Sequence, residues 1–135
     1  IHKIVSGGEL ARLLLALKVV LAGTNTFPTI IFDEIDSGIG GAVAAAVGER
    51  LARLSEVFQV LVVTHSPQVA AKGCKHLLIR KIGSETGNHT LVDDLGSEER
   101  TEEIARMLSG SQVNEAARAA AKQLLNQSDT EQKLQ

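Results

Sequence analysis

Two adjacent acids carry the clearest chemistry in this sequence. Asp33 and Glu34 directly follow the apolar run Thr29–Phe32, which is predicted to be a buried parallel strand. One carboxylate at a strand end can organise Mg²⁺, and a second beside it can orient and deprotonate a water molecule. Asp36 adds a third acid at the start of the glycine-containing loop that runs to Gly41. The alternative is that these acids are solvated strand-end, capping and turn residues with no chemical role.

Thr64 and His65 follow another apolar run, Gln59–Val63, which is also predicted to be a strand. Ligands of open α/β folds collect at the carboxyl edge of the parallel sheet, and a histidine there can hydrogen-bond a terminal phosphate. The alternative is a histidine that is satisfied beside a turn. The spacing of the other histidines in the sequence does not suggest a metal site.

A third candidate site lies near the start of the chain. Ser6 and Glu9 form a capping box around Gly7 and Gly8, so a helix is predicted to begin there and to continue to Gly23. The two glycines would expose the first amides of this helix, whose positive dipole end is suited to an anion. An ordinary capped helix without a ligand is the alternative.

The elements that must position these residues alternate between strand and helix in the first half of the chain. After the first strand, the pattern predicts a small-residue helix, a second strand and a short helix that starts at Ser66: residues 42–54, 59–63 and 66–71. It then changes to a β-hairpin and two helices: strands 76–82 and 89–95, helices 98–108 and 113–125. Residues 127–135 are polar and are expected to form a disordered tail.

Composition excludes several classes of protein. The 135 residues carry a formal net charge of −2, which argues against a freestanding nucleic-acid binder because phosphate neutralisation needs a basic surface. There is no Trp or Tyr and only 3 Phe, so base-stacking platforms are nearly excluded. The single cysteine, Cys74, cannot form an internal disulfide. The longest apolar stretch, residues 10–22, is interrupted by Arg12 and Lys18, so no membrane span is predicted.

The order of the motifs resembles the C-terminal half of the ATPase head in the ATP-binding cassette superfamily. The capped helix start resembles the signature motif, and the strand that ends at Glu34 resembles Walker B. The loop from Asp36 resembles the D-loop, and His65 resembles the switch histidine. Glu9, in place of the Gln typical of transporters, favours the SMC-like branch. Longer matches resemble the bacterial DNA-repair proteins of that branch: residues 6–12, 31–41, 63–71 and 102–108.

This resemblance implies a role for each candidate residue. Asp33 would hold Mg²⁺, Glu34 would be the general base, and His65 would contact the γ-phosphate of ATP. Asp36 would link the two ATP sites of a head dimer. The residues of the signature motif would bind ATP held by the opposite head: Ser6, Gly7, Gly8 and Glu9.

The resemblance also implies an architecture and partners. Residues 1–126 would form the C-terminal lobe of an α/β ATPase head, with a largely parallel sheet flanked by helices. No glycine in the chain is followed by lysine, so the Walker A loop that cradles phosphates is missing and the chain alone would be inactive. Because the chain also begins at Ile1 without an initiator Met, we expect a longer protein whose N-terminal lobe supplies that loop.

The whole protein would hydrolyse ATP at the interface of a head homodimer and thereby control its engagement with DNA in double-strand break repair and recombination. Its expected location is the bacterial cytoplasm, at the nucleoid. Two other functions fit the same residues. A non-catalytic interaction domain with an ATPase-like fold would use the acids and His65 only to cap strands and helices. A metal-dependent phosphoesterase would use Asp33, Glu34 and Asp36, but the Gly-Gly helix start would have no role in it.

Overall fold

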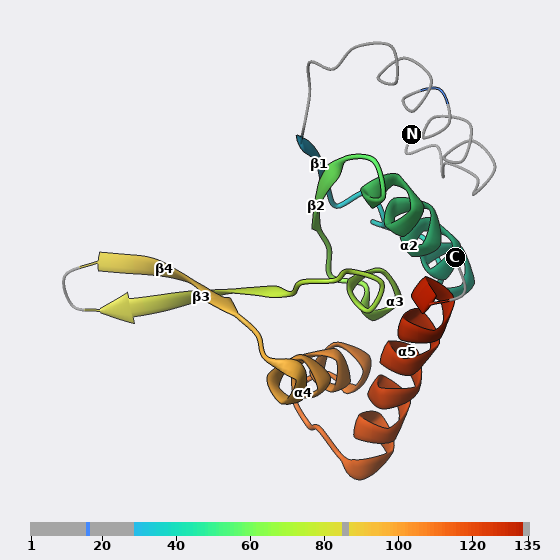
Figure 1. Ribbon diagram of the computed structural model, residues 1–135. Helices are drawn as coiled ribbons and strands as arrows, with labels where there is room; N and C mark the ends of the chain where they lie inside the picture. Colours follow the sequence, from blue (N-terminus) through green and yellow to red (C-terminus); the bar gives the residue numbers. More distant parts are fainter. Residues whose placement is uncertain (1–15, 17–28, 85–86, 134–135) are drawn as a thin grey trace. The chain divides into compact units, whose positions relative to one another are not determined.

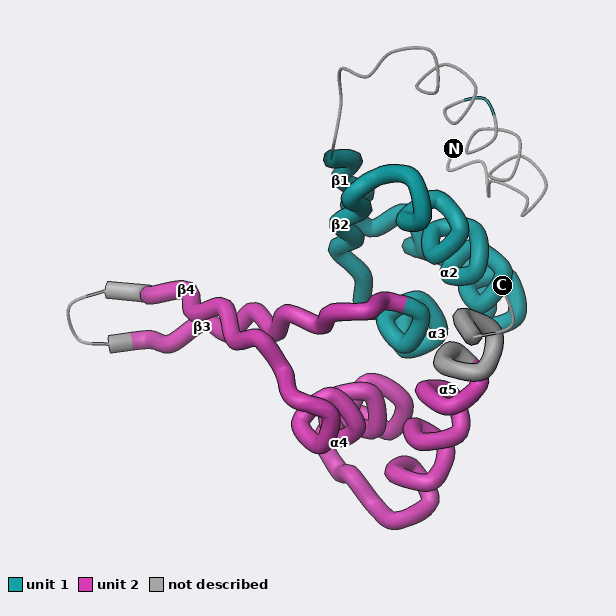
Figure 2. The backbone as a smooth tube through the Cα atoms, in the orientation of Figure 1, with its two compact units in different colours: residues 1–72 teal, residues 73–135 magenta. Residues whose placement is uncertain are grey.

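The computed structural model describes residue 16, residues 29–84 and residues 87–133 of the chain. The chain divides into two compact units, residues 1–72 and residues 73–135 (Figures 1 and 2). The helix predicted from Ser6 to Gly23 lies outside the described residues, and so do the candidate anion-binding residues Ser6, Gly7, Gly8 and Glu9. That residues 1–126 form one lobe stays a prediction.

Unit 1 contains a strand–helix–strand motif followed by one helical turn. Strand β1 (Thr29–Asp33) pairs in parallel with β2 (Gln59–Val63), and helix α2 (Gly41–Ser55) connects them. A short helix, α3 (Pro67–Ala70), follows β2. Parallel neighbours need a crossover of this kind, because a tight turn can only join antiparallel strands. The strands and helices predicted between residues 29 and 71 are confirmed, with β1 one residue longer than expected.

The core of unit 1 lies between α2 and one face of the two strands. Ala44, Val47, Leu51 and Leu54 recur at three- and four-residue intervals, so they share one face of α2, and all four are buried. Val69 of α3 completes this cluster. Partly buried apolar residues of the strands, the loops and the first turn of α2 pack against it: Ile30, Phe32, Ile35, Ile39, Val43, Phe58, Val60 and Val62.

The opposite face of β1 and β2 was expected to be buried, as in a strand covered on both sides. Instead, Ile31, Leu61 and Val63 have exposed fractions of 67%, 42% and 46%. Their side chains alternate with the buried set because successive residues of a strand point to opposite faces. The described part of unit 1 therefore covers only one face of the parallel pair.

Unit 2 consists of a hairpin and a pair of helices. Strands β3 (Leu77–Ser84) and β4 (Gly87–Asp94) pair antiparallel, with Leu77 opposite Asp94 and Ile82 opposite His89. Helices α4 (Ser97–Ser109) and α5 (Glu115–Lys133) pack against each other. Buried apolar residues of the two helices are Ile104, Ala105, Ala117 and Ala121. The predicted hairpin and helices are confirmed.

Both helices of unit 2 begin at capping interactions that the sequence supplies. The Glu99 carboxylate accepts a hydrogen bond from the Gly96 amide at 2.9 Å, and the Asn114 side chain accepts one from the Ala117 amide at 2.8 Å. Arg118 of α5 donates hydrogen bonds to Glu102 of α4 and to Glu115, both at 2.6 Å. Because these ion pairs are exposed, they add little to the free energy of unfolding and mainly orient the side chains that form them.

The prediction of a disordered tail from residue 127 is wrong for residues 127–133, because α5 continues to Lys133. No Gly or Pro interrupts the sequence between Asn126 and Lys133. Each residue added to an existing helix gains a backbone hydrogen bond without a new nucleation cost, so a polar segment without helix breakers extends the helix. Across the ranges that the structure describes, no helix is long and apolar enough to cross a bilayer.

Candidate functional site

The acid pair lies at the carboxyl end of β1. Asp33 is the last residue of the strand and Glu34 follows it, and both side chains are exposed. The Glu34 amide donates a hydrogen bond to the Val63 carbonyl at 2.9 Å, which continues the β1–β2 pairing by one residue. Glu34 also has a φ of +47°, a left-handed conformation that side chains with a Cβ rarely adopt. Strained backbone of this kind is frequent at functional sites.

His65 emerges at the same edge as the acid pair. Asp33 is in register with Val63, so the residues that follow β1 and those that follow β2 leave the sheet side by side. His65 is exposed, two residues after the end of β2. The parallel pairing thus brings Asp33, Glu34 and His65 together at the carboxyl edge, where open α/β folds bind their ligands.

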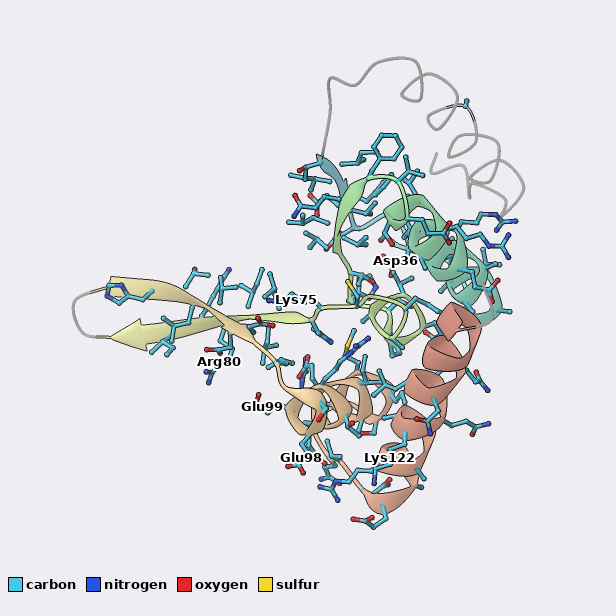
Figure 3. The ribbon with its side chains drawn as sticks, in the orientation of Figure 1. Asp36, Lys75, Arg80, Glu98, Glu99 and Lys122 are labelled. Carbon is cyan, nitrogen blue, oxygen red and sulfur yellow. The ribbon has the colours of Figure 1, made fainter. Side chains whose placement is uncertain are left out.

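Asp36 lies in the loop between β1 and α2 and is labelled in Figure 3. It is 3% exposed, and its Oδ2 accepts a hydrogen bond from the Thr64 hydroxyl. The resemblance implied that Asp36 links two sites of a dimer, and within this chain the carboxylate is turned into unit 1. Sequence reasoning placed Thr64 beside His65 but gave it no role of its own. The available signal was a hydroxyl residue directly between a strand and His65.

The loop that carries Asp36 is a series of tight turns. The Ser37 amide donates to the Glu34 carbonyl at 3.0 Å, and the Ile39 amide donates to the Asp36 carbonyl at 3.4 Å. Gly38 has a φ of +76°, which glycine tolerates because it lacks a Cβ. The loop then enters α2 at Gly40, an N-cap residue without a side chain, so α2 begins with no side-chain cap.

The residues at this edge fit one half of a Mg-nucleotide site. Mg²⁺ is commonly held by one or two carboxylates together with phosphate oxygens and water, and exposed Asp33 can supply one such carboxylate. Within residues 29–84 and 87–133, no three His, Cys, Asp or Glu side chains gather as a set of metal ligands. Asp36 in particular is buried against Thr64.

Comparison with known proteins supports the DNA-repair resemblance. The chain is 54% identical over 126 residues to the DNA repair protein RecN of Rickettsia felis, a match that covers 93% of this chain. It is 50% identical over 127 residues to RecN of Xylella fastidiosa and 50% identical over 125 residues to RecN of Streptomyces coelicolor. These matches cover 23%, 23% and 22% of the relatives, so the chain spans less than a quarter of their length. No protein-family model matches the chain.

A solved structure gives the fold independently. It belongs to work on the ATP-driven dimerization and DNA-stimulated activation of SMC ATPases, and it aligns with a TM-score of 0.54 over 79% of this chain and 63% of that chain. The sequence identity is 21%, so this similarity concerns the fold alone. Over 93% of its length the chain is thus similar in sequence to the DNA repair protein RecN, and its α/β fold is similar to that of a structure from work on SMC ATPases.

Proposed function

We propose that this chain is the C-terminal half of the head of an SMC-like ATPase, and that the full-length protein uses ATP hydrolysis to control its engagement with DNA during double-strand break repair. The observation that carries the proposal is the convergence of Asp33, Glu34 and His65 at one edge of a parallel sheet. The similarity to RecN proteins and the SMC-type fold support it.

Each residue of the edge has a distinct task in this proposal. Asp33 holds Mg²⁺, which when bound neutralises charge on the phosphate oxygens. Glu34 orients the attacking water and accepts its proton. His65 donates a hydrogen bond to the γ-phosphate, where charge redistributes during phosphoryl transfer.

The site is completed by groups outside the described residues. Ser6, Gly7, Gly8 and Glu9 serve the nucleotide held by a second head of a homodimer, through the amides of the helix start that the sequence predicts there. The N-terminal lobe of the same protein supplies the phosphate-binding loop. DNA is bound by the full-length protein, which works in the bacterial cytoplasm at the nucleoid.

The test is the Glu34→Gln variant of the full-length protein. The amide keeps the shape of the side chain and removes the proton acceptor, so we expect hydrolysis to slow by about 10²- to 10⁴-fold while ATP binding is retained. Turnover and nucleotide affinity are measured separately. Glu49→Gln, a matched change at an exposed acid of α2, should leave turnover unchanged. Normal turnover of Glu34→Gln would show that Glu34 is not the base, whereas absence of ATP hydrolysis by the wild-type full-length protein would support the interaction-domain alternative.

A further inference from the structure

A side-chain hydrogen bond joins the two loops that leave the carboxyl ends of β1 and β2. The Thr64 hydroxyl donates to Asp36 Oδ2. The same Thr64 oxygen accepts a hydrogen bond from the Ser66 amide at 2.9 Å. Asp36 follows Glu34 by two residues, and Thr64 directly precedes His65. The contact therefore connects the chain segment that carries the proposed base with the segment that carries the histidine.

This hydrogen bond is the main polar support of a buried charge. Asp36 is 3% exposed, and its other oxygen, Oδ1, has no hydrogen-bond partner among the described residues. A buried carboxylate without partners is strongly unfavourable, so the loop conformation depends on the Thr64 hydroxyl. Loss of that hydroxyl would leave both oxygens unsatisfied and would move the loop toward solvent.

The position of Glu34 depends on the same loop. Its amide is held by the Val63 carbonyl at 2.9 Å, and its carbonyl is held by the Ser37 amide at 3.0 Å. The left-handed φ of +47° at Glu34 persists only while such surroundings impose it. A shift at Asp36 would release this constraint and re-aim the Glu34 side chain.

We propose that Asp36 and Thr64 form a positioning pair, which sets the separation of Glu34 from His65 within a single chain. This inference rests on the proposed ATPase function. A base and a phosphate donor act together only when both are held close to the productive geometry, and a displacement of about 1 Å can cost about 100-fold in rate. Neither member of the pair needs to touch the nucleotide.

The test uses Thr64→Val and Thr64→Ser in the full-length protein. Valine keeps the branched shape without the hydroxyl, and serine keeps the hydroxyl. We expect Thr64→Val to lower kcat by about 10-fold or more while the ATP dissociation constant changes by less than about twofold. Thr64→Ser should restore most of the rate. This split between kcat and affinity, with recovery by serine, distinguishes positioning from a general loss of structure.

A double variant tests whether Thr64→Val loses rate only because it unfolds. Asp36→Ala combined with Thr64→Val removes the buried charge together with its donor, so folding should recover relative to Thr64→Val alone. The positioning contact is still absent, and kcat should therefore remain about 10-fold or more below wild type. Wild-type turnover in a folded double variant would overturn the positioning pair.

Glu34→Gln, measured in the same assay, distinguishes a wrong positioning pair from a wrong base. If Glu34→Gln slows hydrolysis but Thr64→Val turns over as fast as Thr64→Ser, the positioning pair is wrong and the ATPase proposal stands. If Glu34→Gln hydrolyses ATP as fast as wild type, Glu34 is not the base and the positioning pair fails, while the ATPase proposal stands. If the wild-type full-length protein hydrolyses no ATP, the proposed function fails.

Discussion

Glu34 combines an exposed carboxylate with an unfavourable backbone conformation. A left-handed φ of +47° brings its Cβ close to neighbouring backbone, and conformations of this kind cost about 1–3 kcal/mol. Glycine would adopt the same conformation without that cost. A catalytic role would explain why this position holds glutamate and not glycine.

The strain at Glu34 predicts a separation of stability from activity. Glu34→Gly should raise the free energy of unfolding by about 0.5–1 kcal/mol, because relief of backbone strain exceeds the added entropy of glycine in the unfolded chain. ATP hydrolysis by the full-length protein should be lost in the same variant. Denaturant titration measures the first effect, and Glu34→Gln, which keeps the Cβ, should show no such stabilisation. Destabilisation by glycine would show that the conformation is not strained.

His76 predicts a pH dependence of unit 2. Burial lowers the pKa of His76 below its usual value of 6.5, and the charge of Arg100 lowers it further, while Glu103 of the same helix opposes the shift. Its Nδ1 is buried without a hydrogen-bond partner in the described part of the chain. The folded state therefore favours the neutral imidazole.

Because the folded pKa is the lower one, unfolding binds a proton near and below pH 6.5. Stability should be unaffected by His76 above that pH and should fall as the pH drops through the lower, folded pKa. Denaturation midpoints at several pH values check this, and His76→Gln should flatten the fall. His89→Gln, at an exposed histidine of β4, is the matched control and should retain it.

At the scale of elements, helices α2 and α3 approach closely because α2 presents a glycine. A Cβ built on Gly48 would lie 3.0 Å from Lys72 Cγ, 3.2 Å from the Gln68 carbonyl oxygen and 3.3 Å from Val69 Cα. Two of these three atoms belong to backbone and cannot rotate away. Gly48 therefore allows α3 to pack close to α2. Because α3 begins at Pro67, this packing also fixes the chain just after His65.

Gly48→Val should destabilise unit 1 by about 1–3 kcal/mol, because overpacking forces α3 away from α2. Gly40→Ala is the control, because a Cβ there would have no atom within 4 Å and its φ of −75° suits any residue. That control should change stability by less than about 0.5 kcal/mol. Thermal unfolding of both variants gives the comparison. Equal stability of the two variants would contradict close α2–α3 packing.

On the scale of the whole molecule, the proposed function assigns groups for metal, water and γ-phosphate to the candidate edge and leaves the other phosphates to be bound elsewhere. The printed sequence holds no glycine followed by lysine. The chain also spans less than a quarter of the RecN proteins that it matches. The proposed ATP site therefore needs a second lobe and a second head.

The isolated chain should accordingly bind Mg-ATP weakly and should not hydrolyse it. Calorimetric titration of the chain with Mg-ATP is the measurement, with far-ultraviolet circular dichroism as the check that the helices are formed. Submicromolar binding by the chain alone would contradict the half-site interpretation.

The sequence by itself determined the order and type of the elements. Hydrophobic spacing separated the strands β1 and β2 from the helix α2, and two strand-like segments joined by the polar turn 83–88 marked the hairpin β3–β4. These signals are local, so they can be read without tertiary contacts. The motif order also sufficed for the resemblance to SMC-like repair proteins. The roles of Asp33, Glu34 and His65 stay predictions.

Only the tertiary structure decided which side chains meet. The contact of Asp36 with Thr64 joins residues 28 positions apart, and it exists because the parallel register places the ends of β1 and β2 side by side. The resemblance implied a dimer contact for Asp36, which stays a prediction. Its burial and its bond to Thr64 are properties of the folded chain that the sequence alone does not show. The length of α5 could not be predicted from the sequence for a related reason. Polar segments have weak intrinsic preferences, and an adjoining packed helix decides their conformation.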